Sequence, residues 1–582
     1  MKLKASERIV IFALIILSCN QATQQTSSTE FPAADAIYYD GDILTMEGDS
    51  ANYAEAVAIK NGQIIFTGPK SEAEKFRGDS TKMNDLKGKT MMPGFIDPHL
   101  HPILGSVVLN TKFATPFDWV FPWGKVNAVR GHDAFIAKVK EYNAALKNPA
   151  ELLIVWGYMQ PFDGNMSRRE LDSISAIRPI IIWHYSTHEM YLNTAALKSL
   201  GITEAATKAN KQVSYDQGRF WEAGFFEIVI PKLAPAIMND SVMKVAMEKF
   251  REVTHLGGVT TVGDMATGVT GSLSADLKFI ENGLENDQTP FRIQLTPDVN
   301  TLNLVMGGDY SKTLAAVKEF EKKGTAHIAA GHSVKLFADG AFFSENFQVL
   351  PPGYSDGHEG SWIMQPDRLK KSIKFWWDSS DYTIHIHCNG SEGLAVILDE
   401  LKKLEKEHPK QDHRLTIEHF GQSSAEQSQQ IASSGAVVSA NPYYLYSMGD
   451  KFAAGNLGQE RASQMVRLGS LLKAKVPFAL HSDFTMAPLQ PLLLAWITVN
   501  RVTADGTLMA SEEKIPVYNA LQAITCNAAF VLRLEKETGS IKTGKKADFV
   551  ILAENPMKAD PMKIKDIKIL ETVFEGKSFP EN

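Results

Sequence analysis

The stretch "MMPGFIDPHLHP" (residues 91–102) places two histidines, His99 and His101, one residue apart at the end of a short apolar run. If residues 94–101 form a β-strand, alternation sends both imidazoles to the same face, about 6–7 Å apart. Two imidazoles so placed can bind one metal ion. A second pair, "IHIH" (384–387), occurs further along the chain, so the surrounding sequence must decide what the pattern means.

The middle of the chain contains eight strand-like apolar segments, and stretches of helical character separate most of them. Strands that alternate with helices predict a parallel sheet, and eight such units predict an α/β fold of the (β/α)8 TIM-barrel type. The segments are residues 94–101, 259–265, 291–297, 333–339, 382–388, 414–420, 436–442 and 477–483.

The two ends of the chain differ from this middle part. Residues 35–92 and 535–582 show short alternating segments separated by glycine turns, which predict one small β-sandwich domain built from both ends. The barrel is then expected over residues 93–534. The interval 102–258 is too long for one crossover and has strand-like runs of its own, so we expect an inserted subdomain after the first barrel strand that covers the mouth of the barrel.

The amino terminus has the organisation of an export signal. Basic residues precede the apolar run 9–17, which is too short for a stable membrane span, so residues 1–18 are predicted to be a signal peptide. "IILSCN" resembles a bacterial lipoprotein signal, which implies lipidation of Cys19, a polar tether over 19–34, and a periplasmic or outer-membrane lipoprotein held at the membrane by its lipid. The alternative is an ordinary cleaved signal with an incidental cysteine.

Composition narrows the class of partner. The 582 residues carry a net charge of −7 and have no basic stripe, which argues against a nucleic-acid partner. Besides Cys19 there are only Cys388 and Cys526, so no disulfide framework is expected. A small-molecule substrate is the expected partner, and a homo-oligomer is left open.

Polar side chains gather where the predicted barrel strands end. Chemistry in a (β/α)8 barrel takes place at the carboxyl ends of the strands, and four histidines, one lysine and one aspartate occupy those positions. This coincidence is far more specific than a single His-x-His. The residues are His99, His101, Lys335, His387, His419 and Asp483.

Several separated motifs, in order, are similar to the amidohydrolase superfamily, and most of all to its amidohydrolase family 3 branch, which includes N-substituted formamide deformylases. They are "PGFIDPHLHP", "SVKLFADG", "IHIHCNG", "TIEHFGQ", "HSDF" and "TGSIKTGKKADFVIL". The segment 167–202 also resembles that branch, whose insertion bears a histidine near the site. The matching position is His188, a candidate substrate-binding residue.

Residue types suggest how a metal would be held. His99 and His101 offer nitrogens and Asp483 an oxygen to a first ion; this set suits Zn²⁺, although Fe, Mn or Co also fits. His387 and His419 are candidates for a second ion. Lysine is normally protonated and a poor ligand. The resemblance implies that Lys335 is carboxylated by CO₂ and bridges two metals.

We therefore predict a metal-dependent hydrolase that cleaves a non-peptide C–N bond of an amide, formamide, carbamate or cyclic amide by a metal-activated hydroxide. Asp483 is the candidate for accepting the proton of water and passing it to the leaving amine. An esterase or lactonase with the same site and a non-catalytic binding or regulatory barrel are the alternatives.

Three neighbouring residues are expected to have structural roles. His385 and His481 should lie one layer deeper and form hydrogen bonds inside the barrel, and Glu418 should point away from the interior. The chain also departs from the family where Gly390–Ser391 replaces Gly-Asp and where His481–Ser482 replaces Gly-Ser. Because these departures change residues near the pocket, the substrate of a relative cannot be assigned to this protein.

Overall fold

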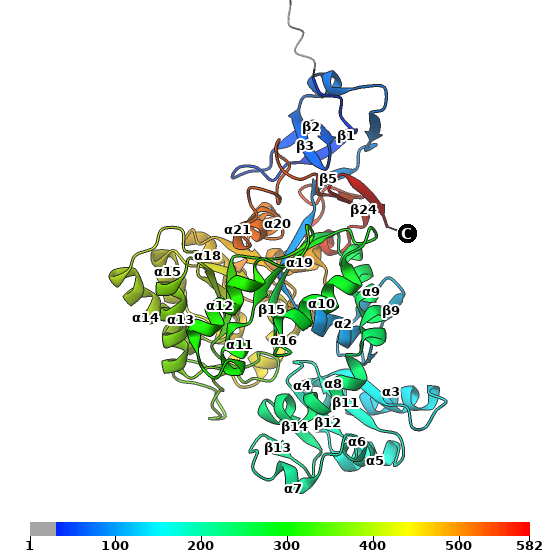
Figure 1. Cartoon of the computed structure of the whole chain (residues 1–582), viewed down its shortest axis with the longest axis vertical. Coiled ribbons are helices and arrows are strands. Elements are labelled where there is room, and N and C mark those ends of the chain that lie inside the picture. The colour runs from blue at the N-terminus through cyan, green and yellow to red at the C-terminus, as the bar shows by residue number, and fades with distance from the viewer. Residues whose placement is uncertain (1–30, 582) are drawn as a thin grey trace, which may run out of the picture.

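The computed structural model describes residues 31–581. Three parts follow one another along the long axis of the molecule: a small sheet at one end, a unit of parallel strands and helices in the middle, and an inserted subdomain at the other end (Figure 1). Cys19 and the predicted signal peptide lie outside the described residues, so the lipoprotein interpretation stays a prediction. Within residues 31–581, no helix is both long enough and apolar enough to cross a membrane.

Each of the eight predicted segments contains a strand of the central unit. Hydrogen bonds order the strands as β17-β16-β15-β6 and as β18-β19-β20-β21-β22, and every pairing is parallel. The additional strand β17 (Ile328–Ala330) was not expected from the sequence. The other strands are β6 (Phe95–Leu100), β15 (Val259–Thr267), β16 (Arg292–Pro297), β18 (Ser333–Phe337), β19 (Thr383–Cys388), β20 (Thr416–His419), β21 (Val437–Ala440) and β22 (Phe478–Leu480).

The two groups of strands meet at both of their edges. At one edge an isolated parallel bridge joins Asp298, after β16, to Lys335 in β18. At the other edge the backbone N–H of Asp483, after β22, donates to the carbonyl of His99 in β6 at 3.0 Å. The ladder is interrupted at each meeting point. The pairing therefore establishes an α/β unit of parallel strands, and full closure into a (β/α)8 barrel stays a prediction.

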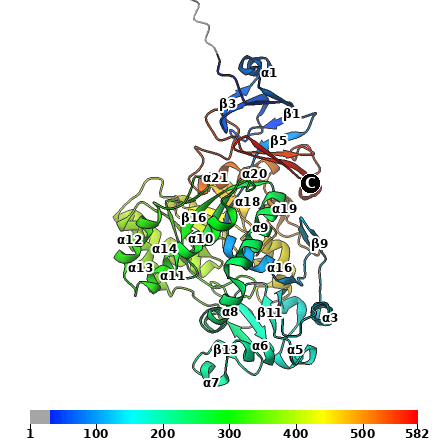
Figure 2. The same cartoon turned by 45° about the vertical axis from the view of Figure 1, so that its right-hand side comes forward.

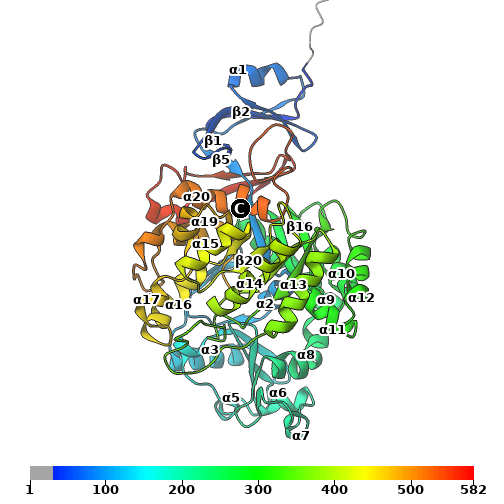
Figure 3. The same cartoon turned by 90° about the vertical axis from the view of Figure 1, so that its left-hand side faces the viewer.

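Helices surround this unit (Figure 3), and their sequences explain where they form. In α13 the apolar side chains Leu369, Ile373, Trp376 and Trp377 share one buried face at helical spacing. α15 starts with a capping box at Ser424 and ends at a left-handed glycine. The helices include α10 (Leu273–Leu284), α11 (Val299–Val305), α12 (Tyr310–Phe320), α13 (Pro366–Ser379), α14 (Ser391–Glu407), α15 (Ala425–Ser434), α16 (Tyr443–Ala454), α17 (Gly458–Ser463), α18 (Leu468–Lys473), α19 (Pro491–Asn500), α20 (Val517–Ala523) and α21 (Cys526–Val531).

The small sheet contains strands from both ends of the chain. Its order is β25-β24-β23-β5-β1-β2-β3, and β4 pairs with β1. The two ends of the chain meet where β23 pairs antiparallel with β5. These strands form one sheet by hydrogen bonding, and the division into the two layers of a sandwich stays a prediction. The strands are β1 (Ala36–Leu44), β2 (Tyr53–Lys60), β3 (Gln63–Gly68), β4 (Lys82–Asp85), β5 (Thr90–Pro93), β23 (Phe549–Leu552), β24 (Ile569–Phe574) and β25 (Lys577–Pro580).

The inserted subdomain has a sheet of its own, ordered β13-β14-β12-β11-β10-β7. It lies on the side of the central unit away from the small sheet (Figure 2). Helices α2 (Pro102–Leu109) and α9 (Asp240–Leu256), at the two ends of residues 102–258, pack on each other and on α10 of the central unit. The elements between them are β7 (Lys112–Phe113), β8 (Trp119–Phe121), β9 (Gly124–Val126), α3 (His132–Ala145), β10 (Leu153–Tyr158), α4 (Gln160–Asp163), α5 (Arg168–Ile174), β11 (Ile180–His184), β12 (Glu189–Leu192), α6 (Thr194–Ser199), α7 (Glu204–Thr207), β13 (Val213–Ser214), β14 (Arg219–Trp221) and α8 (Ile230–Ile237).

Candidate metal centre

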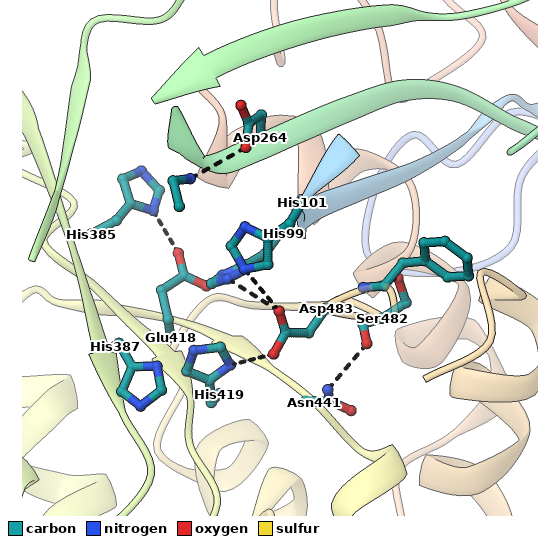
Figure 4. A network of polar contacts seen from close by, with 12 residues as sticks. His99, His101, Asp264, His385, His387, Glu418, His419, Asn441, Ser482 and Asp483 are labelled. Carbon is teal, nitrogen blue, oxygen red and sulfur yellow. Dashed lines mark hydrogen bonds and ion pairs between the residues drawn. The ribbon is translucent and has the colours of Figure 1, made fainter. Parts of the chain in front are cut away.

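Three of the predicted ligands converge on the carboxylate of Asp483 (Figure 4). The Nε2 atoms of His101 and His99 lie 3.1 and 3.7 Å from its Oδ1. The Nδ1 atom of His419 lies 3.6 Å from its Oδ2. Donor atoms of His99, His101 and Asp483 are all within 4.8 Å of one another, as a common metal ion requires.

The chain turns sharply where β20 and β22 end, and these turns place the donors. His419, Phe420 and Asp483 have φ angles of 73°, 51° and 52°, a left-handed conformation that is uncommon for residues other than glycine. The turn at Asp483 is fixed by backbone hydrogen bonds, because the N–H of Ser482 donates to Asp97 at 3.1 Å. Such conformations persist where the surrounding structure enforces them, often at functional sites.

His387 and Lys335 lie beside this group. The ring of His387 is 4.4 Å from that of His419, and its Nε2 is within 3.0 Å of the side-chain nitrogen of Asn389. Lys335 is completely buried, and its Nζ has no hydrogen-bond partner among residues 31–581. Burial lowers the pKa of Lys335 to about 8, and it lowers that of His387 to about 3. Both side chains are thus moved toward their neutral, metal-binding forms.

The remaining charges favour the same protonation states. Burial, followed by the charge of Lys335, holds the pKa of His99 well below its usual value, so its imidazole is neutral. Burial alone would raise the pKa of Asp483. The hydrogen bond and the charge of His101 outweigh burial and lower that pKa, so Asp483 is a carboxylate. Neutral imidazoles and an ionised carboxylate are the forms that coordinate a cation.

The structure shows that the interpretation of Glu418 was wrong. Its carboxylate is buried and points into the site, where Oε2 lies 2.7 Å from Nδ1 of His99 and Oε1 lies 2.6 Å from Nδ1 of His385. Alternation assigned Glu418 and His419 to opposite faces. That rule applies to extended backbone, and the positive φ of His419 lets two successive residues reach the same centre.

The two deeper histidines behave differently from each other. His385 forms the expected hydrogen bond inside the barrel, to Glu418. His481 is fully buried, yet neither of its ring nitrogens has a hydrogen-bond partner in the described part of the chain. The prediction of a hydrogen-bonded His481 is therefore not met by the protein's own side chains.

His188 lies in the inserted subdomain, between β11 and β12. Its Nδ1 is 3.1 Å from Oε2 of Glu222, and Oε1 of Glu222 accepts a hydrogen bond from Asn346 at 3.1 Å. Burial alone would lower the pKa of His188, but the charge of Glu222 raises it above the usual value, and Asp483 adds to that effect. Since Asn346 follows β18, Glu222 ties this histidine to the central unit. No motif in the sequence pointed to Glu222.

The donors fit a divalent cation. Buried polar atoms normally have hydrogen-bond partners. Here several that face one another have none within residues 31–581: Nε2 of His99, both ring nitrogens of His419 and Nζ of Lys335. A mixed set of imidazole and carboxylate donors is that of zinc and of other first-row divalent metals.

Parallel strands with histidine and aspartate donors at their carboxyl ends define a metal-dependent hydrolase. The profile of the amidohydrolase family matches residues 82–579, so the chain belongs to that family. The protein is similar to the putative amidohydrolase YtcJ of Bacillus subtilis (24% identity, covering 93% of this chain and 98% of the relative). It is also similar to the N-substituted formamide deformylase of Arthrobacter pascens (23%, covering 90% and 94%).

Two further matches extend this comparison. The protein LONG AFTER FAR-RED 3 of Arabidopsis thaliana is 27% identical over 90% of this chain and 88% of its own length. The crystal structure of an uncharacterized metal-dependent hydrolase from Pyrococcus horikoshii superposes with a TM-score of 0.69 and 20% identity, covering 90% of this chain and 99% of that one. The crystal structure supports the fold over the 90% of this chain that it covers.

Proposed function

We propose that this protein hydrolyses a non-peptide C–N bond, such as that of an amide, formamide, carbamate or cyclic amide. The observation that carries the proposal is the convergence of His99, His101 and His419 on the ionised Asp483, among buried nitrogens that lack protein partners. The deformylase among the relatives points to the class of bond. The two groups of parallel strands are interpreted as one (β/α)8 barrel.

In this proposal His99, His101 and Asp483 hold a first divalent cation, Zn²⁺ by preference, and His387 with His419 and Lys335 holds a second. When bound, such a cation lowers the pKa of a coordinated water to near neutrality and polarises the carbonyl under attack. Carboxylation of Lys335 would add a negative oxygen donor between the two positions. Its pKa of about 8 favours this modification, because the neutral amine is the form that reacts with CO₂.

Asp483 is the proposed proton carrier. It is ionised and lies 3.1 Å from Nε2 of His101, so one of its oxygens faces the ligand group. As a carboxylate it accepts the proton released when water attacks the carbonyl, and it then delivers that proton to the nitrogen of the departing amine. Each proton transfer requires that the water or the leaving nitrogen lie within hydrogen-bond distance of the Asp483 carboxylate.

His188 is the proposed substrate contact. The Glu222 carboxylate raises the pKa of His188 and so favours its charged, hydrogen-bond-donating form, and Asn346 donates a hydrogen bond to Glu222. A donor of this kind can bind the oxygen of the substrate carbonyl as negative charge develops there. The insertion would therefore contribute to binding as well as covering the site.

The test uses the purified, Zn²⁺-loaded protein and a panel of N-substituted formamides, carbamates and cyclic amides, each paired with the ester or lactone of the same shape. Release of an amine from members of the first set, lost in Asp483→Asn, supports the proposal. Turnover restricted to esters and lactones would replace it with the esterase alternative. Bound metal without turnover of either set would favour a binding barrel.

Export and lipidation form a separate proposal, which rests on the sequence of residues 1–19. We expect the protein at a bacterial envelope membrane, attached through a lipid on Cys19. Metabolic labelling with a fatty acid tests this, with Cys19→Ala as the matched variant. Equal label in both proteins would leave an ordinary cleaved signal as the explanation.

A further inference from the structure

His481 occupies the layer beneath the proposed ligands. It follows β22 and lies two residues before Asp483. Its imidazole stacks on that of His99, with the ring centres 4.5 Å apart and the planes inclined by 16°. Its ring centre is 5.2 Å from that of His419. His481 thus adds a third imidazole to the pair of His99 and His419, whose ring centres are 4.7 Å apart.

The ring of His481 is unusual for a buried side chain. The side chain is inaccessible to solvent, and both nitrogens lack a hydrogen-bond partner among residues 31–581. Leaving a buried polar group without a partner costs about 1–3 kcal/mol, so a side chain placed in this way implies a partner other than the protein. The neighbouring His385 shows the contrast, since Glu418 satisfies its Nδ1.

Donor atoms of His99, His419 and His481 lie within 4.8 Å of one another, and all three residues are buried. Glu418 occupies Nδ1 of His99, so only Nε2 of His99 is available to a cation. The same nitrogen belongs to the shallower set of His99, His101 and Asp483. One nitrogen binds one ion, and the two sets therefore compete for His99.

We propose that His481 is a metal ligand which, with His99 and His419, forms an alternative and deeper cation position made of three imidazoles. Nitrogen donors alone select borderline cations such as Zn²⁺, Cu²⁺ or Ni²⁺ and disfavour Mg²⁺ and Ca²⁺. This inference rests on the proposed metal centre, because it shares His99 with that centre. It adds a ligand to those assigned to that centre above.

The experiment loads the metal-free protein with Zn²⁺. It measures affinity by competition with a chelating dye, and it counts imidazole ligands by X-ray absorption at the zinc edge. In His481→Asn we expect the affinity of the deeper position to fall at least about tenfold and the count to fall from three imidazoles toward two. His413→Asn is the matched control, since it removes a buried histidine that is hydrogen-bonded to Ser434.

Thermal melting checks that each variant is folded, and His481→Gln replaces the asparagine variant if that one does not fold. Wild-type protein with no more than two imidazoles per zinc would also overturn the inference without any variant. Unchanged affinity and an unchanged imidazole count in His481→Asn would leave the proposed centre standing and remove only His481 from it. A wild-type protein that binds no Zn²⁺ would overturn both.

Discussion

At the amino-terminal end of β16, the buried guanidinium of Arg292 donates to the Asp548 carboxylate at 2.6 and 3.1 Å and to Glu575 at 3.0 Å. At the carboxyl-terminal end of the strands, the Nζ of Lys335 is equally buried but has no partner in the part of the chain described by the structure. The central unit thus buries two basic side chains in two different ways.

The comparison distinguishes a buried charge that stabilises the fold, at Arg292, from a buried basic group without a protein partner, at Lys335. Asp548 also accepts hydrogen bonds from Thr538 and from the backbone of Glu575, so this network joins the small sheet to the central unit. At the opposite end the buried nitrogens face one another, and that arrangement stabilises the fold only when something binds them. Variants at the two ends should therefore fail in different ways.

The largest effect is expected for Asp483→Ala. Loss of the proposed proton carrier, which is also a proposed ligand, should lower kcat by at least about 10²–10⁴-fold while the protein stays folded. Steady-state kinetics and circular dichroism measure the two quantities. Asp412→Asn, at the opposite end of β20, is the control and should retain activity. Wild-type turnover in Asp483→Ala would remove this residue from the mechanism.

Arg292→Met should show the opposite behaviour. It leaves the buried Asp548 without its cation, which costs about 3–5 kcal/mol when one partner of a buried ion pair is removed. We expect earlier unfolding in urea, followed by tryptophan fluorescence, and normal zinc content in the protein that remains folded. Adding Asp548→Asn should recover part of the loss. If Arg292→Met had normal stability but had lost its zinc, the ion-pair network and the candidate metal centre at the opposite ends of the strands would be coupled.

Glu418→Gln sharpens the comparison within the site itself. An amide offers one oxygen where the carboxylate offers two, so His99 and His385 can no longer both donate their Nδ1 protons. We expect zinc affinity to fall about 10–100-fold, as is usual when a residue that orients a metal-bound histidine is lost. Chelator competition measures it. An unchanged affinity would make Glu418 a structural carboxylate only.

The smallest effect concerns pH. Glu222 raises the pKa of His188, so the charged imidazole persists to higher pH than it would without Glu222. The stabilisation from the His188–Glu222 ion pair is lost as pH rises through that raised pKa. In Glu222→Gln the alkaline limb of the kcat/KM profile should move to lower pH. In His188→Asn that limb should be absent. Identical profiles for Glu222→Gln and wild type would argue against the contact.

The sequence was informative where one side chain per strand carries the signal. The eight strands and the convergence of His99, His101, His419 and Asp483 could be predicted because each strand is an apolar run with a polar residue at its boundary. The short strand β17 escaped because three residues, Ile328–Ala330, give too little periodicity to recognise.

The rest depended on backbone geometry and on distant partners. Glu418 was misplaced because the left-handed turn at His419 is not visible in the order of residues. Glu222 meets His188 across 34 positions, and the contact exists only once the insertion folds back on itself. The unsatisfied nitrogens of His481 are a property of packing, and no pattern of residue types reports them.

The pairing of β5 with β23 has a consequence for how the chain matures. Translation produces β1–β5 first and β23–β25 last, so β5 stays without its partner strand until the whole central unit has been made. The small sheet closes only after the last part of the chain is made. A polypeptide truncated before β23 would contain all the donor residues, but the edge of β5 would have unpaired backbone groups that can pair with other chains.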